Sequence, residues 1–198
     1  MLLTAHAGYT VGAAWLTQRR LSSRWLLDYR LLALMAILPD VVDRFLYICV
    51  LPGAESGRLV AHTILFNLVL IVILACLRRG LWLYGVAALG HLALDVQGLA
   101  PHHALWPLLG ADLGYIGITG DGLGASAPLF DRIWLRAHEA LTPYGQISRQ
   151  ALLWELGGLL VLVAFAIGHD LYRPKTFLRF LKTGKIAMRA HTTVRERV

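Results

Sequence analysis

The sequence predicts an all-α protein, a polytopic membrane helical bundle of about five spans. The chain has 198 residues, of which 57% are hydrophobic and 16% are charged. Soluble domains carry about 25% charged residues, and the mean hydropathy here is +0.59. The apolar runs alternate with clusters of arginine, and most are long enough to cross a bilayer as helices of roughly 17–25 residues.

Five apolar segments are predicted to be the membrane elements. They run from about Leu2 to Leu16, Trp25 to Leu51, Leu59 to Leu77, Leu81 to Leu99 and Ala151 to Leu171. Pro52 with Gly53 ends the second segment and Pro101 follows the fourth, as expected where helices stop. The first segment is short for a span.

The second segment contains Pro39, followed by Asp40 and Asp43. Proline removes a backbone donor and crowds the preceding turn, so a kinked helix is predicted. The two acids are three residues apart and share a helix face. A carboxylate at the middle of a membrane helix costs about 3 kcal/mol, which makes both acids functional-site candidates. The alternative is a pair of capping acids at the membrane interface.

Residues 1–172 are predicted to form one membrane-embedded domain. Within it, residues 101–149 form an extracytoplasmic spacer with an amphipathic surface helix from about Asp131 to Leu141. Residues 173–198 form a basic cytoplasmic tail, which is expected to be partly disordered or to lie on the lipid surface.

The arginines predict the orientation in the cell inner (cytoplasmic) membrane. Arg19, Arg20, Arg78, Arg79 and the tail should be cytoplasmic by the positive-inside rule, so the spacer is extracytoplasmic. The net charge of +7 does not indicate a nucleic-acid partner, because the cations cluster between apolar segments.

Ionisable side chains within the apolar segments gather on the extracytoplasmic side of this map. Three histidines and several carboxylates without thiolates are a ligand set for zinc, manganese or iron. The sequence therefore predicts a divalent metal site, with zinc as the metal and manganese as the alternative. Its predicted ligands are His6, Asp40, His62, His91 and Asp95. Each histidine alone could instead be a packed, hydrogen-bonded residue.

Two further residues are predicted to take part in catalysis. Asp43 is a candidate bridging ligand or general base, and Arg58 offers the guanidinium fork that binds phosphate oxygens. A metal ion lowers the pKa of bound water and polarises a phosphoryl or carbonyl oxygen. Together these residues predict a metal-dependent hydrolase.

Four motifs carry a resemblance to a known family. They are Thr4-Ala5-His6-Ala7-Gly8, Leu38 to Arg44 around the two acids, Gly57 to Thr63 around His62, and Gly90 to Asp95 with Trp106-Pro107. In order and spacing they resemble the YdjM-type inner-membrane metal-dependent hydrolases, which are distantly similar to zinc-dependent phospholipase C and P1-type nucleases. In two places the chain departs from that pattern. Gly57 stands where many members have a histidine, for which His102 or His103 is a candidate replacement. The two acids are also one residue further apart than in many members.

The resemblance implies a membrane metal-dependent hydrolase. The predicted site opens at the outer membrane boundary, which favours a phosphoester of a lipid or lipid-linked substrate. Two alternatives remain. One is a proton- or ion-coupled transporter, because intramembrane acids and histidines form relays. The other is a non-enzymatic membrane protein that binds haem or metal.

Overall fold

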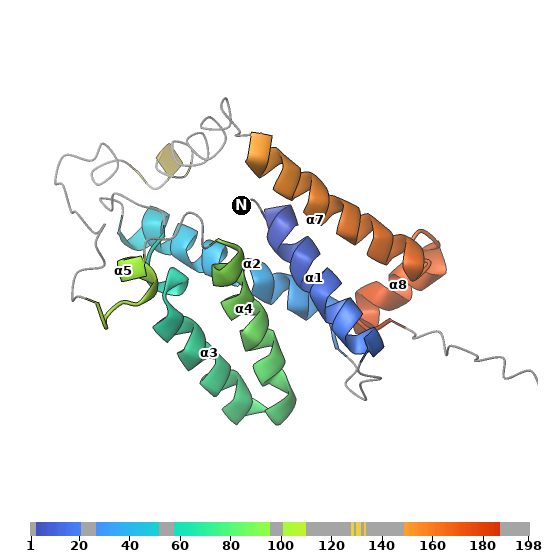
Figure 1. Cartoon of the computed structure of the whole chain (residues 1–198), viewed down its shortest axis with the longest axis horizontal. Helices are drawn as coiled ribbons and strands as arrows, with labels where there is room; N and C mark the ends of the chain where they lie inside the picture. The colour runs from blue at the N-terminus through green and yellow to red at the C-terminus, as the bar shows by residue number, and fades with distance from the viewer. Residues whose placement is uncertain are drawn as a thin grey trace, which may run out of the picture.

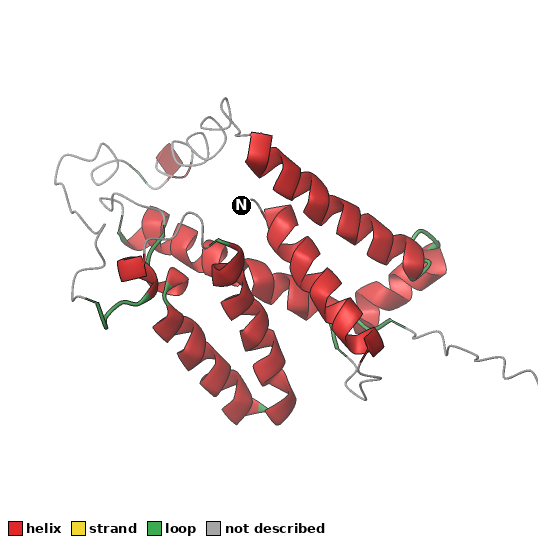
Figure 2. Cartoon of the chain, viewed as in Figure 1, coloured by secondary structure: helices red, strands yellow, loops and turns green. Residues whose placement is uncertain are grey.

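The structure is a computed structural model that describes residues 3–20, 27–51, 58–95, 101–109, 128, 130–131, 133 and 149–186. Throughout these residues the regular elements are helical and no strand occurs (Figure 2). The all-α prediction is confirmed. Most of the predicted spacer, its amphipathic helix beyond residue 133 and the tail beyond residue 186 lie outside the described residues.

Each predicted membrane segment contains an α-helix. The α-helices are α1 (Leu3–Arg20), α2 (Tyr29–Phe45), α3 (Ile64–Leu77), α4 (Trp82–Leu94), α5 (Pro101–Ala104), α7 (Arg149–Gly168) and α8 (Pro174–Thr183). A π-helical turn (Leu46–Val50) continues α2, and 3-10 turns precede α3 (Val60–His62) and α4 (Arg79–Leu81). The segment after Arg173, predicted as a tail, thus contributes a regular helix.

Side-chain caps fix where two of these helices begin. The Asp28 carboxylate accepts the backbone N–H groups of Arg30 and Leu31 at the start of α2, which are donors that the helix itself leaves unpaired. The Thr63 hydroxyl accepts the N–H of Phe66 at the start of α3. Pro39 lies inside α2.

The helices pack as a bundle in which α1 lies between α7 and the pair α2 and α4, while α3 packs along α4 (Figure 1). Glycines allow the close approach of α1 and α7. A Cβ atom on Gly158 would lie 2.8 Å from the Thr4 carbonyl oxygen, and one on Gly8 would overlap the backbone of Gly158. This close contact fixes the first turns of α1 against α7.

The interior differs between the two ends of the bundle. At one end, a cluster of buried apolar side chains joins α1, α2, α4 and α7, and its members are Val11, Tyr29, Leu32, Tyr84, Ala87, Phe165 and Ile186. At the other end the buried side chains are largely polar and include His6, Asp43, His62, Asn67 and His91.

One helix among the described residues, α7, is long and apolar enough to cross a membrane, and α3 is apolar but shorter. Both helices expose much of their apolar surface. Exposed residues on α3 include Leu68, Val72 and Leu77, and those on α7 include Leu153 and Leu160. The arrangement of five spans stays a prediction.

Candidate metal centre

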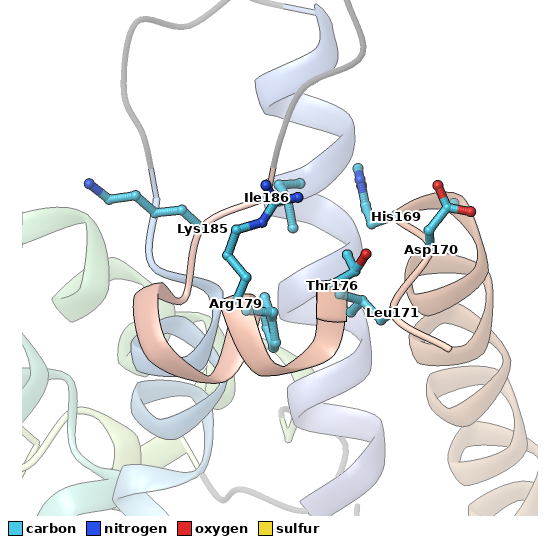
Figure 3. Close-up of a pocket in the computed structure, with 9 residues that line it drawn as sticks. His169, Asp170, Leu171, Thr176, Arg179, Lys185 and Ile186 are labelled. Atoms are coloured by element: carbon cyan, nitrogen blue, oxygen red, sulfur yellow. The ribbon is translucent and has the colours of Figure 1, made fainter. Parts of the chain in front are cut away.

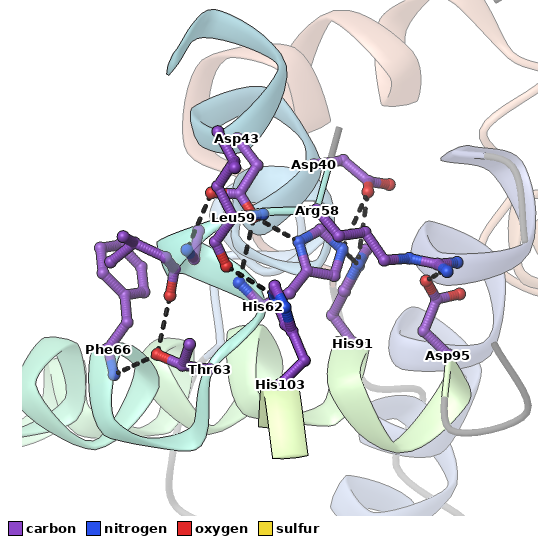
Figure 4. Close-up of polar contacts among 12 residues, drawn as sticks. Asp40, Asp43, Arg58, Leu59, His62, Thr63, Phe66, His91, Asp95 and His103 are labelled. Carbon is purple, nitrogen blue, oxygen red and sulfur yellow. Dashed lines mark hydrogen bonds and ion pairs between the residues drawn. The ribbon is translucent and has the colours of Figure 1, made fainter. Parts of the chain in front are cut away.

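Four segments far apart in the sequence bring the predicted site residues together. His6 comes from α1, Asp40 and Asp43 from α2, His62 from the turn before α3, and His91 and Asp95 from the end of α4. Figure 4 shows the residues of α2, α4 and the turn facing one another, with Arg58 across from them. His6, His62 and His91 are at most 1% exposed.

The potential ligand atoms form two overlapping groups. The ligand atoms of His6, Asp40 and His91 lie within 4.8 Å of one another, and so do those of His62, His91 and Asp95. Both groups contain His91, so the other four predicted metal ligands surround this ring. The prediction that His and Asp side chains form a cluster able to hold a metal ion is confirmed.

Hydrogen bonds behind the two central histidines set which nitrogen of each ring carries the proton. His91 Nδ1 lies 2.9 Å from the Ala36 carbonyl oxygen, and His62 Nδ1 lies 2.6 Å from Asp43 Oδ2. Both oxygens are acceptors, so each Nδ1 is the donor and each neutral ring presents the lone pair of Nε2 to the cluster.

Three acceptor atoms therefore converge on one point. His62 Nε2 and His91 Nε2 are 3.2 Å apart, and Asp40 Oδ1 lies 3.3 Å from the first and 3.5 Å from the second. Ligand atoms about 2.0 Å from a tetrahedral zinc ion are separated by roughly 3.3 Å. The spacing of the three atoms thus fits one face of such a site. With both rings neutral all three atoms are acceptors, which a bound cation would satisfy.

His6 and Asp95 extend the cluster on the α1 side. The His6 ring stacks on His91, with 4.0 Å between the ring centroids. His6 Nε2 lies 3.3 Å from Asp95 Oδ1, and Asp95 Oδ2 accepts a hydrogen bond of 2.9 Å from the Arg58 guanidinium. Arg58 therefore compensates part of the negative charge that the acids bring.

Asp43 is enclosed behind His62. It is 0% exposed, and its two oxygens accept the backbone N–H groups of Leu59, Ala61 and His62 at 2.6, 2.8 and 3.2 Å. With the His62 ring it has four donors. These contacts fix both the turn before α3 and the orientation of the His62 ring.

Asp40 and Arg58 mark the opening of the cluster. Their side chains are 32% and 38% exposed, whereas the side chain of Asp95 is only 4% exposed. A molecule that approaches from outside therefore meets a carboxylate and a guanidinium first.

Two residues outside the predicted ligand set support the cluster. The Glu155 carboxylate on α7 accepts the Ala5 N–H at 3.1 Å and the Thr4 hydroxyl, which holds the turn of α1 that carries His6. His103 Nε2 lies 2.9 Å from the Leu59 carbonyl oxygen, behind the His62 turn. The signal for Glu155 was a lone carboxylate in an apolar segment.

Comparisons with protein family models, with curated proteins and with solved structures find no match for this chain. The resemblance to the YdjM-type hydrolases rests on the four sequence motifs, and the metal site rests on the side chains described above.

Proposed function

We propose that this protein is a membrane metal-dependent hydrolase that acts on a phosphoester of a lipid or lipid-linked substrate. The observation that carries the proposal is the convergence of His62 Nε2, His91 Nε2 and Asp40 Oδ1 at 3.2–3.5 Å. Neutral imidazoles and a carboxylate without thiolates are the donor set of catalytic zinc sites, and manganese is the alternative.

The residues of the cluster divide into ligands and supports. His62, His91 and Asp40 would hold the ion, and His6 and Asp95 are close enough to complete its ligands. Bound there, a divalent ion supplies a water of lowered pKa and polarises a phosphoryl oxygen. Asp43 and the Ala36 carbonyl oxygen orient the two rings, which favours a positioning role for Asp43 over a catalytic one.

The opening supplies a group for substrate binding. The Arg58 guanidinium donates to Asp95, and its side chain is 38% exposed, which makes it the cation that a phosphate oxygen can approach from outside. The fork geometry of arginine suits phosphate better than the point charge of lysine.

The distribution of polarity supports a membrane location. Apolar side chains are exposed along α3 and α7, while the buried polar residues include His6, His62, His91, Asp43 and Asp95. A bilayer covers exposed apolar surface and disfavours unpaired polar groups. The arginine-rich end of the bundle is the one at which α1 ends with Arg19 and Arg20. The positive-inside rule puts this end in the cytoplasm and the histidine and aspartate cluster toward the extracytoplasmic face. In a variant without Cys49 and Cys76, a single cysteine at position 183 should not react with an impermeant thiol reagent on intact cells. Labelling at that position would indicate the opposite orientation.

A proton-coupled transporter is the second candidate, and one observation favours it. His62 lies between two acids, with Nδ1 2.6 Å from Asp43 and Nε2 3.3 Å from Asp40, an arrangement that a protonated ring would also satisfy. Stoichiometric metal in the purified protein favours the hydrolase, whereas metal-free protein that carries protons in vesicles favours the transporter.

The substrate class is tested by replacing Arg58 with lysine. With lipid phosphoesters and pyrophosphates as substrates in detergent, R58K should lower phosphate release at least about ten-fold, because one bidentate contact is lost. Its metal content should equal that of the wild type. No phosphate release by the metal-loaded wild type, together with cleavage of an amide or carboxylic ester, would overturn the phosphoester assignment.

A further inference from the structure

Helix α8 presents an apolar stripe, formed by Phe177, Leu178 and Leu181, to the outside of the protein. These side chains are 44%, 56% and 47% exposed. Lys175 and Lys182 are exposed as well. Leu178 follows Lys175 by three residues and precedes Lys182 by four, so both lysines lie beside the apolar stripe on the helix surface.

The opposite side of α8 is fixed to the bundle. Phe180 packs against Phe165 of α7, with ring centroids 6.4 Å apart. The carbonyl oxygen of Gly184, just past the end of α8, accepts the Tyr29 N–H at 2.8 Å. Because these contacts set the rotation of α8, the apolar stripe cannot turn inward.

The location of α8 indicates what covers the stripe. It follows the end of α7 that lies away from the candidate metal centre, and the end of α1, with Arg19 and Arg20, lies near it (Figure 1). A short helix that folds back directly after an apolar helix lies where the headgroup layer would be if α7 crosses a bilayer.

We propose that α8 lies in the cytoplasmic headgroup layer and that Lys175 and Lys182 bind the phosphate groups of anionic phospholipids. Acyl chains then cover the apolar stripe, and the lysine ammonium groups reach the headgroups along its edge. Charge complementarity selects anionic over zwitterionic lipid. This inference rests on the proposed membrane location of α7 and is independent of the metal chemistry.

Arg179 is close to both lysines and therefore does not serve as a control. It is exposed and is four residues after Lys175 and three before Lys182, so the three cations share one edge of α8. Arg179 also lines a cavity with Thr176, His169 and Ile186 at the junction of α7 and α8, and Figure 3 shows its side chain directed toward Ile186. The charge-matched control is K182R, which keeps a cation at the position where K182Q removes it.

The test uses the full chain with Cys49 and Cys76 replaced by serine and a fluorescent label on one new cysteine, at Leu178 or at Thr183. Vesicles contain brominated phosphatidylglycerol or brominated phosphatidylcholine, whose bromine atoms quench the label on contact. The ratio of the two quenching curves gives the relative affinity for the anionic lipid at the labelled position. Flotation with the vesicles reports insertion, and metal analysis of the same samples reports the metal centre separately.

The label at position 178 should be quenched strongly and the label at position 183 weakly. Phosphatidylglycerol should be preferred, and K182Q should lower that preference about five-fold, as expected for one cation near an anionic surface. K182R, which keeps the cation, should change it less than about two-fold. Equal effects of the two variants, or equal quenching at both positions, would overturn the proposal. If the label at position 178 becomes less accessible to solvent as the protein concentration rises in lipid-free detergent, the stripe instead binds a second copy of the chain, and the proposal is overturned.

Discussion

Polar side chains occur at both ends of the bundle, beside the apolar cluster at one end and as the buried interior at the other, but their donors and acceptors are arranged differently. At the arginine-rich end, the Asp28 carboxylate accepts from the backbone and side chain of Arg30, and the Tyr29 hydroxyl donates to Gln18 at 2.5 Å. At the other end, His62, His91 and Asp40 turn acceptors toward one another.

The difference separates structural polar groups from functional ones. Burying a polar group is costly unless it is hydrogen-bonded, and at the arginine-rich end Asp28, Tyr29 and Gln18 are hydrogen-bonded within the chain. At the histidine end, Asp43 and the Ala36 carbonyl oxygen meet it behind the rings, whereas in front of the rings His62 Nε2, His91 Nε2 and Asp40 Oδ1 lie within 3.5 Å of one another. The acceptors left in front of the rings indicate a site for a cation.

The largest expected effect on stability comes from replacing Asp43 with alanine. D43A leaves the N–H groups of Leu59, Ala61 and His62 without their acceptor. Each such loss costs about 1–3 kcal/mol, so the free energy of unfolding should fall by about 3 kcal/mol or more. Denaturation in detergent with a chelator present measures this loss without any metal contribution. The same variant should bind less metal, because the His62 ring loses its orientation. If the free energy of unfolding of D43A equals that of the wild type, Asp43 does not hold the turn before α3.

A smaller effect is expected from D28A at the arginine-rich end. Loss of a helix N-cap costs about 1 kcal/mol, and metal content should not change. The hydrogen bond from the Arg30 side chain holds the pKa of Asp28 below its ordinary value. The stabilisation by the ionised carboxylate is therefore full above a pH of about 4 and is lost as the pH falls through the lowered pKa. The melting temperatures of the wild type and D28A should therefore differ less in acid than at neutral pH. A loss of metal in D28A would contradict the distinction between the two ends of the bundle.

The helices and the composition of the site could be predicted from the sequence because both depend on local patterns. Apolar runs bounded by arginine, proline and glycine predict helices, and alternating helix directions bring His6, Asp40, His62 and His91 to one end. The structure brings the predicted ligands together.

The supporting contacts could not be predicted, because they depend on tertiary packing. The apolar run from Leu59 predicted an uninterrupted helix, but Asp43 binds the backbone there and α3 begins only at Ile64. The partner of His91 is a backbone carbonyl oxygen, which no side-chain pattern reveals. The sequence predicted only a basic tail where α8 lies. The helix was missed because it gains its order from packing against α7, which a local pattern does not reveal.

Elemental analysis of the purified protein tests the central claim most directly. Wild-type protein should carry stoichiometric zinc or manganese, and D40N and H91A should each lose it, because removal of a ligand typically abolishes such a site. D28A, purified in parallel, should retain the metal. Full metal content in both D40N and H91A, or metal-free wild-type protein after growth and purification with zinc and manganese supplied, would contradict the account.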